Sequence, residues 1–271
     1  MKLPLKGAFR IMSRLNLALW GRKYRFIFIL GHMRSGSTLL AHILGSHLEL
    51  VGAGESHISY QTPVDLPKLV LSTCETLHRP FLRETYIVDQ INHDYLTDDV
   101  LRSRRVYRCV ILLRDPEATL KSMLKLSIWS EDEALQIYTN RMAQLSHYGT
   151  LLGRRALLVE YDKLVDHSET TLSKITDFLD LNSPLTSIYA THRMTARVPG
   201  YGDPSPNIKV GRIVRTPEHD INISCATLLT AQRAFQNCRS VVSAETAQRA
   251  HKTSENAPTA GGGVIPIDAT D

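Results

Sequence analysis

The stretch that decides the fold occupies residues 26–40 and reads FIFILGHMRSGSTLL. Residues 26–30 form a short apolar run rich in aromatic and β-branched side chains, which is typical of a buried strand. The turn from Gly31 to Thr38, rich in glycine and hydroxyl groups, then opens a helical pattern. Backbone N–H groups at the start of a helix, together with the helix dipole, bind anions. The stretch therefore predicts a phosphate-binding loop between a strand and a helix.

Apolar runs alternate with helical patterns along the rest of the chain. We predict strands at residues 25–30, 50–53, 86–88, 106–113 and 156–159, and helices at about 38–46, 65–78, 116–125, 131–151, 168–179 and 221–239. This alternation is typical of βαβ units. We therefore predict an α/β fold with three α/β/α layers, a mostly parallel central sheet and P-loop topology.

Composition sets the broad class of the protein. With 271 residues, 43% hydrophobic and 22% charged, the chain is long enough to bury its own core. The four cysteines are spread without metal-ligand or disulfide spacing, so we expect a reduced, cytoplasmic protein without a metal site. We find no apolar stretch of about 18 residues and no convincing export signal, and we expect no membrane span.

Positive charge is concentrated at the N-terminal end. The net charge is +5, and the basic residues of this end all precede the first acidic residue, Glu49; they are Lys2, Lys6, Arg10, Arg14, Arg22, Lys23, Arg25 and Arg34. One interpretation is a solvated amphipathic helix, and another is peripheral contact with a membrane surface or an anionic substrate. Nucleic acid is disfavoured, because no basic patch interleaved with aromatic residues follows.

The loop distinguishes between nucleotide-binding families. Its spacing from Gly31 to Gly36 matches the phosphate loop of nucleotide kinases, except that Ser37 stands where those enzymes carry a lysine. The segment from Arg34 to Thr38 resembles the phosphosulfate-binding loop of the sulfotransferase family. This resemblance implies that Arg34, Ser35, Gly36, Ser37 and Thr38 bind the 5′-phosphosulfate of 3′-phosphoadenosine 5′-phosphosulfate (PAPS).

A second block follows the predicted strand at residues 106–113. Arg114 ends this strand and Ser122 lies about two helical turns later, so both side chains can face one anion. The pair is similar to the 3′-phosphate site of the family. The alternative is an arginine that pairs with a structural acid such as Asp115.

A third block lies in the long loop at residues 191–217, which we expect to cover a ligand. It is similar to the late cofactor loop of the family, in which basic residues around a glycine contact the 3′-phosphate. Here the basic residues are Lys209 and Arg212, and the glycine is Gly211. The run from Glu160 to Leu164 also resembles a strand end of the family. The resemblance extends over about residues 26–212. We predict a basic amphipathic segment at 1–24, a sulfotransferase-like domain at 25–240 and a flexible tail at 241–271.

Catalysis needs a base for the acceptor hydroxyl. Glu55 stands where carbohydrate and tyrosine sulfotransferases have a glutamate base, and His57 is the alternative. Arg34 would neutralise the leaving oxygen, and sulfuryl transfer so arranged requires no metal. The chain departs from related enzymes at Gln90, where a lysine is often found near the end of the third strand.

Three functions fit this sequence. The first is a PAPS-dependent sulfotransferase that acts on a hydroxyl of a small molecule, lipid or glycan. The second is a P-loop kinase, disfavoured by Ser37 and by the lack of a clear strand ending in a metal-binding aspartate. The third is a non-catalytic anion-binding module. The acceptor segments are expected at 56–85 and 94–104, and the sequence indicates neither the acceptor nor the oligomeric state.

Overall fold

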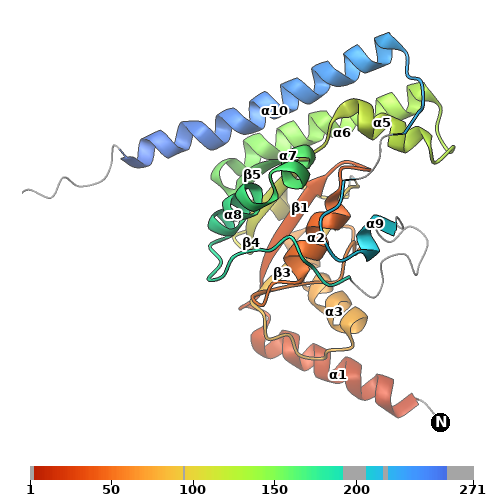
Figure 1. Ribbon diagram of the computed structural model, residues 1–271. Helices are drawn as coiled ribbons and strands as arrows, with labels where there is room; N and C mark the ends of the chain where they lie inside the picture. Colours follow the sequence, from red (N-terminus) through yellow and green to blue (C-terminus); the bar gives the residue numbers. More distant parts are fainter. Residues whose placement is uncertain (1–2, 94, 192–205, 216–218, 255–271) are drawn as a thin grey trace, which may run out of the picture.

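The computed structural model describes residues 3–93, 95–191, 206–215 and 219–254 (Figure 1). Within these ranges the central sheet has five strands in the order β2-β3-β1-β4-β5, and every strand pairing is parallel. The strands are β1 (Arg25–Gly31), β2 (Leu50–Gly52), β3 (Tyr86–Ile91), β4 (Val106–Leu113) and β5 (Ala156–Glu160). The predicted α/β fold class is confirmed.

Strand β1 lies at the centre of the sheet, so the segment that follows it is flanked on both sides. Leu30 is opposite Ile91 of β3, and Gly31 is opposite Leu112 of β4. Because the strands are parallel, their carboxyl ends meet at one edge of the sheet, where ligands bind in open α/β folds. The loop after β1 therefore lies between the ends of β3 and β4.

Helices cover both faces of the sheet, because alternate residues of β1 point to opposite sides. Ile27 and Ile29 pack in one cluster with α2 (Ser37–Gly45), α7 (Tyr161–Asp166) and α8 (Ser168–Leu179). Phe26, Phe28 and Leu30 pack in the other. That second cluster includes side chains from α3 (Leu66–Leu77), α4 (Asp98–Arg102), α5 (Pro116–Leu124), α6 (Glu131–Leu152) and α10 (Cys225–Ser254). The short elements are η1 (Pro63–Asp65), η2 (Gly153–Arg155) and α9 (Pro206–Lys209).

Helix α10 runs past the expected boundary of the domain at residue 240. It continues to Ser254, and Val242 is buried in the same core as α6. A Cβ atom added to Gly149 of α6 would lie 2.6 Å from the Val242 side chain, so the two helices are in close contact there. The start of the expected flexible tail, at 241, is thus wrong, while residues 255–271 lie outside the described residues.

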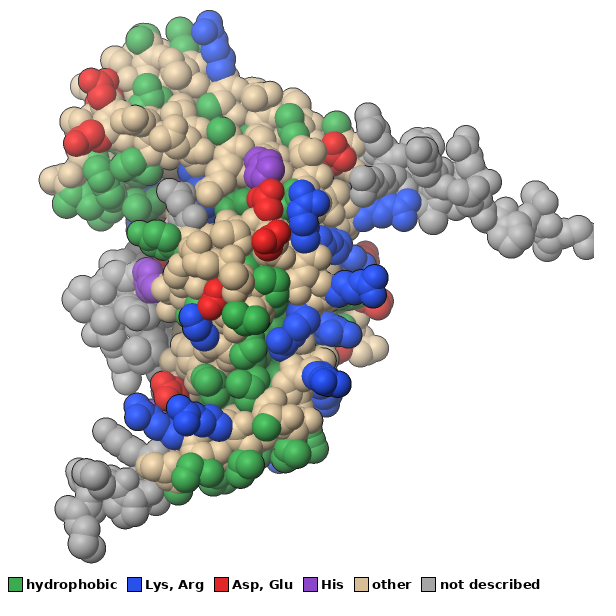
Figure 2. Space-filling view, turned by 180° about the vertical axis from the view of Figure 1, so that it is seen from behind, with side chains coloured by type: hydrophobic (Ala, Val, Ile, Leu, Met, Phe, Trp, Pro, Cys, Tyr) green, Lys and Arg blue, Asp and Glu red, His purple; other side chains and the backbone are tan. Residues whose placement is uncertain are grey.

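Helix α1 (Leu3–Trp20) lies at the end of the molecule away from α10, and it packs on α3 (Figure 1). Apolar side chains gather along this edge of the molecule (Figure 2). No helix in the described part of the chain has a stretch long and apolar enough to cross a membrane. All four cysteines lie in the described ranges and are free thiols.

Candidate active site

The loop after β1 turns sharply at Gly36, just before α2 begins. Gly36 has a φ of +86°, a left-handed conformation that favours glycine. A Cβ atom at this position would lie 2.3 Å from the ring of Tyr161, the first residue after β5. The tyrosine ring thus closes one side of the turn. Arg34 also has a positive φ, +64°, which is unusual for a residue with a side chain.

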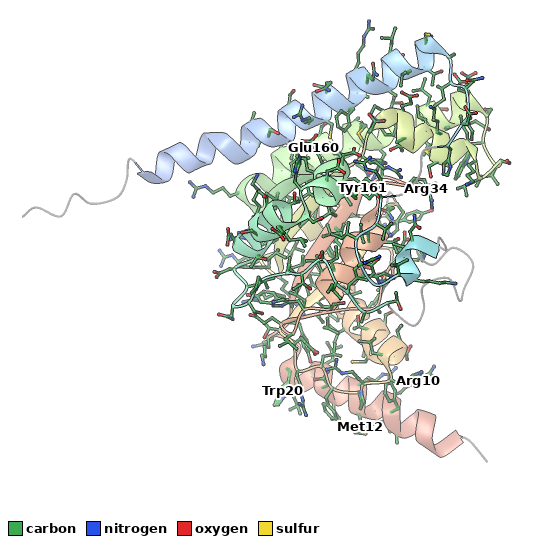
Figure 3. The ribbon with its side chains drawn as sticks, in the orientation of Figure 1. Arg10, Met12, Trp20, Arg34, Glu160 and Tyr161 are labelled. Atoms are coloured by element: carbon green, nitrogen blue, oxygen red, sulfur yellow. The ribbon has the colours of Figure 1, made fainter. Side chains whose placement is uncertain are left out.

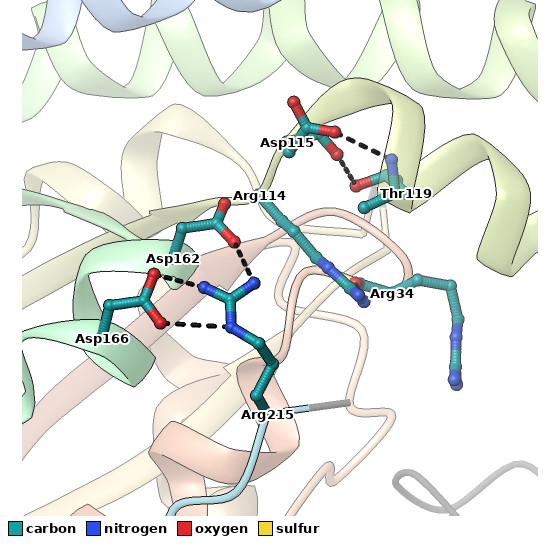
Figure 4. A network of polar contacts seen from close by, with 8 residues as sticks. Arg34, Arg114, Asp115, Thr119, Asp162, Asp166 and Arg215 are labelled. Atoms are coloured by element: carbon teal, nitrogen blue, oxygen red, sulfur yellow. Dashed lines mark hydrogen bonds and ion pairs between the residues drawn. The ribbon is translucent and has the colours of Figure 1, made fainter. Parts of the chain in front are cut away.

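The structure brings together the first two sequence blocks. Arg34 Nε donates a hydrogen bond of 2.8 Å to Ser122 Oγ on α5. The side chain of Arg114 points towards the loop backbone and donates a bond of 3.1 Å to the carbonyl oxygen of Arg34 (Figure 4). Two arginines and a serine, predicted separately as anion ligands, therefore lie at one place beside the loop. Figure 3 shows that Arg34 and Tyr161 lie at the end of the sheet opposite α1.

Arg114 is held over an aromatic ring rather than by an acid. Its guanidinium carbon lies 4.7 Å from the centre of the Tyr161 ring. Asp115, the alternative partner, instead caps α5 by accepting a bond of 2.8 Å from the Ala118 N–H. Arg114 Nε is buried without a hydrogen-bond partner, and so is Ser35 Oγ. Buried polar atoms usually have partners, so these two atoms beside one loop are exceptions.

His32 is neutral and links the loop after β1 to the backbone of Arg114, which follows β4. Its pKa is lowered to about 4, mainly by burial; the charges of Arg141 and Arg114 also act to lower it, and the hydrogen bond with the Met33 carbonyl acts to raise it. The Nδ1 atom of the ring lies 2.9 Å from the Met33 carbonyl oxygen. The Nε2 atom accepts a 3.1 Å hydrogen bond from the Arg114 N–H. These contacts assign the proton to Nδ1. The ring therefore holds the two loops together without adding charge.

The surroundings of the arginines are cationic. Lys125 Nζ lies 3.4 Å from His219 Nδ1. Partial burial lowers the pKa of His219, and the charges of Lys125, Arg114 and Arg34 lower it further. The charges of three cationic side chains, Lys125, Arg114 and Arg34, thus reach one histidine. This arrangement suits a multiply charged anion.

The other side of the loop contacts the end of β3. Ser37 Oγ donates a 3.1 Å bond to Asn92 Oδ1. Gln90 Nε2 donates a 3.1 Å bond to Glu55 Oε2 and lies 3.5 Å from Thr38 Oγ1. Gln90, where relatives often have lysine, therefore connects the first turn of α2 with the predicted base.

Glu55 has the properties of a general base at neutral pH. Burial raises its pKa to about 7, the nearby charge of Asp89 raises it too, and a hydrogen bond with Asn92 lowers it. Burial also raises the pKa of Asp89 to about 6, although Ser56, Tyr60 and the Gln90 N–H donate to it. A base works best when its pKa lies near the working pH.

His57 is less suited to that task. Its side chain is exposed and its ring lies against that of His93, with the centroids 6.5 Å apart. Its φ of +53° is strained for a non-glycine residue. The catalytic roles of Glu55 and His57 nevertheless stay predictions.

The third block packs against α2. The Tyr189 N–H donates a 2.9 Å hydrogen bond to the Gly211 carbonyl oxygen. The Tyr189 hydroxyl donates a hydrogen bond to the Arg212 carbonyl oxygen. Tyr189 and Ile208 pack in the cluster that contains α2. Lys209 and Arg212 are exposed, and their contact with a nucleotide stays a prediction. Much of the loop expected to cover the ligand, residues 192–205 and 216–218, lies outside the described residues.

Two arginines near the site were missed by the sequence reasoning. Arg141 of α6 is buried and donates bonds of 2.8 Å to the carbonyl oxygens of Gly31 and Ile91. Arg215 contacts Asp166 and Asp162 of α7 (Figure 4). The signal for Arg141 was a charge within the apolar stripe of a helix. Arg215 gave no such signal in the sequence.

No grouping of three or more histidine, cysteine, aspartate or glutamate side chains that could hold a metal occurs among the described residues. Asp89 is the acid of β3, the strand beside β1, but both its oxygens accept bonds from neighbouring residues. A P-loop kinase needs such an acid for Mg²⁺. The prediction that the reaction needs no metal stays a prediction.

Comparison with known proteins identifies the fold. No protein-family model matches the chain, and no curated protein matches it. Among solved structures, the sulfotransferase domain of the Synechococcus PCC 7002 olefin synthase is similar over 78% of this chain and 93% of its own, at 19% identity and a TM-score of 0.53. The sulfotransferase domain of the curacin biosynthetic pathway is similar over 78% and 97%, at 19% identity and a TM-score of 0.50. The chain thus has the fold of sulfotransferase domains.

Proposed function

We propose that this protein is an enzyme that transfers a sulfuryl group from PAPS to a hydroxyl of a carbohydrate, lipid or small metabolite. The observation that carries this proposal is the convergence of Arg34, Ser122 and Arg114 beside the loop of a sulfotransferase fold. Arginine binds phosphate and sulfate groups with several donors at once. The lysine that a kinase would use is absent from the loop, where Ser37 stands.

The residues of the site fit a bisphosphorylated nucleotide. The backbone N–H groups that open α2 offer donors to one anionic group, and the buried Ser35 Oγ lies in the same turn. Arg114 Nε, also buried and without a partner, and Ser122 offer donors to a second. When bound, PAPS supplies the activated sulfuryl group. The charge of Lys125, which acts on the same place as Arg34 and Arg114, adds attraction for the donor.

Glu55 is the residue that we assign to the acceptor. Its carboxylate accepts the proton of the acceptor hydroxyl, and its pKa of about 7 allows it to do so near neutral pH. Gln90 holds this carboxylate by a hydrogen bond and also lies beside Thr38, so the base is fixed relative to the loop. Arg34 would balance the negative charge that forms on the leaving oxygen.

Calorimetry with adenosine 3′,5′-bisphosphate, compared with ATP plus Mg²⁺, tests the donor site. We expect the bisphosphate to bind and ATP with Mg²⁺ to bind more weakly. Arg114→Ala should weaken bisphosphate binding roughly tenfold or more, because a charged hydrogen bond is lost. Arg104→Ala is the matched control, since Arg104 is an exposed arginine two residues before the start of the same strand. Tighter binding of ATP would instead favour a kinase.

The transfer itself needs a separate assay. The protein is incubated with radiolabelled PAPS and pools of carbohydrates, lipids and phenols, and labelled products are separated. A labelled product that disappears in Glu55→Gln supports the proposal. Binding of the bisphosphate without any labelled product would favour a non-catalytic anion-binding module.

A further inference from the structure

Helix α1 exposes apolar residues and buries polar ones. Ser13 and Asn16 are 2% and 1% exposed. The exposed apolar residues are Ile11 (61%), Met12 (40%), Leu15 (52%), Leu19 (73%) and Trp20 (45%). They form a band along the edge of the molecule, and Met12 points away from the sheet (Figures 2 and 3). An apolar band that faces outward is typical of an interaction surface.

Hydrogen bonds fix the orientation of this helix. Tyr24 Oη donates a 2.8 Å bond to Asn16 Oδ1, and Asn16 Nδ2 lies 4.0 Å from Cys74 Sγ of α3. Phe9 and Leu17 pack on the core from the same side. Turning the apolar band inward would break these buried contacts. The outward band is therefore a property of the folded domain.

The band is bordered by positive charge. Helix α1 has no acidic residue, and the first acid of the chain is Glu49. Arg10 and Arg14, one helical turn apart, are exposed beside Ile11, and the exposed Arg22, Lys23 and Arg25 follow the helix. Arg10 also lies 3.7 Å from Glu75 of α3, on a contact open to water. An apolar face flanked by arginine and lysine matches an anionic lipid surface.

We propose that α1 lies in the surface of an anionic lipid bilayer. Ile11, Leu15 and Leu19 insert between the lipid chains, and the basic residues contact the phosphate and carboxylate headgroups. Trp20 suits the interface, where its ring has one apolar and one wet side. A second copy of α1 is a poorer partner, because two helices without acids would bring like charges together.

This contact would leave the proposed donor site in water. The loop with Arg34 lies at the other end of β1 from α1 (Figure 3). A strand of seven residues spans about 23 Å at its usual rise. Lipid binding through α1 is thus separable from nucleotide binding, and it does not depend on the proposed activity.

Co-sedimentation with lipid vesicles tests the proposal. The full chain is mixed with vesicles of phosphatidylcholine alone, or with roughly one third phosphatidylserine. We expect binding to the anionic vesicles that weakens as salt is raised, because charge attraction is screened. Leu15→Glu/Leu19→Glu should weaken it roughly tenfold or more, and Arg14→Ser/Arg22→Ser by a similar factor. Trp129→Phe leaves Trp20 as the one tryptophan of the sequence. In this variant the fluorescence of Trp20 should shift to the blue when anionic vesicles are added.

Leu48→Glu is the matched control, since Leu48 is 89% exposed and lies outside α1. It should bind vesicles as the wild type does. The urea unfolding midpoint should be nearly the same in Leu15→Glu/Leu19→Glu and the wild type, because both leucines are exposed, and this shows that the variant folds. Equal binding to both kinds of vesicle, or full binding by this variant, would overturn the proposal. A wild-type dimer that the variant dissociates, with no vesicle binding, would assign the band to a second copy instead.

Discussion

Arg34 Nε donates to Ser122 Oγ at 2.8 Å, although the two residues are 88 positions apart in the chain. The bond joins the loop after β1 to the first helix after β4. It orients a guanidinium group that belongs to a residue with a left-handed backbone, at a φ of +64°. We infer that Ser122 positions Arg34 as well as offering its own hydroxyl to a ligand.

This relationship predicts coupling between the two side chains. Ser122→Ala should weaken binding of adenosine 3′,5′-bisphosphate about fivefold, because Arg34 loses a hydrogen bond that fixes it. In Arg34→Ala the same serine change should have a smaller effect, with a coupling energy of about 1 kcal/mol. Calorimetry on the two single variants, the double variant and the wild type measures this value. If the effects of Ser122→Ala and Arg34→Ala on the binding free energy simply add, Ser122 contributes to binding independently of Arg34.

A second prediction concerns the turn at Gly36. Gly36→Ala should lower the free energy of unfolding by about 3 kcal/mol, because the left-handed backbone and the nearby Tyr161 ring both oppose a Cβ atom. Gly54 is a matched control, since its φ is +96° but no atom lies within 4 Å of an added Cβ. Gly54→Ala should therefore cost only about 1 kcal/mol. Urea unfolding of both variants gives the difference, and equal losses would show that the tyrosine contact has no effect.

A third prediction concerns the pH dependence of turnover. Only the ionised form of Glu55 can accept a proton, and its pKa is raised to about 7. We therefore expect kcat/KM to rise with pH below about 7 and to level off above it. Glu55→Gln should reduce kcat roughly a hundredfold or more and leave bisphosphate affinity unchanged. If kcat/KM of Glu55→Gln rises with pH in the same way, the titrating group is not Glu55, and His57 is the first alternative to test.

Gln90 offers an independent test of the same base. Its hydrogen bond stabilises the charged carboxylate of Glu55. Gln90→Met removes this bond, so the pKa of Glu55 should rise and the midpoint of the pH profile should move to higher pH. A merely structural role of Gln90 would reduce the rate at every pH without moving the midpoint.

Most of the fold could be predicted from the sequence because its strands are short apolar runs with clear ends. The predicted strand at 106–113 has the bounds of β4, and the other four differ by three residues or fewer at one end. Helix α4 gave no signal, because its five residues are too few for a helical period. The end of α10 was missed because the residues around the buried Val242 are largely polar.

The site could be predicted in part. The residues near Gly36 were recognised from the loop itself, and Arg114 and Ser122 from a resemblance. The bond between Arg34 and Ser122 could not be foreseen, because it depends on how β1 and β4 pair. Asn92 was missed for the same reason, since its contact with Ser37 crosses from β3 to the loop.

The last prediction concerns Arg141, which ties the ends of β1 and β3 together from α6. Its guanidinium donates to the carbonyl oxygens of Gly31, Ile91 and His93. Arg141→Met keeps much of the volume but leaves these buried oxygens without their donor. We expect the free energy of unfolding to fall by about 3 kcal/mol, against little change for Arg154→Met at an exposed position.

The same variant should change the pKa of His32, which the charge of Arg141 helps to lower. Loss of that charge should raise this pKa, and NMR titration of the His32 ring measures the shift. His32 accepts a hydrogen bond from the Arg114 N–H, and protonation of His32 would remove this bond. Bisphosphate binding in Arg141→Met should therefore weaken as the pH falls. Unchanged stability together with an unchanged pKa of His32 would mean that Arg141 does not organise this edge of the sheet.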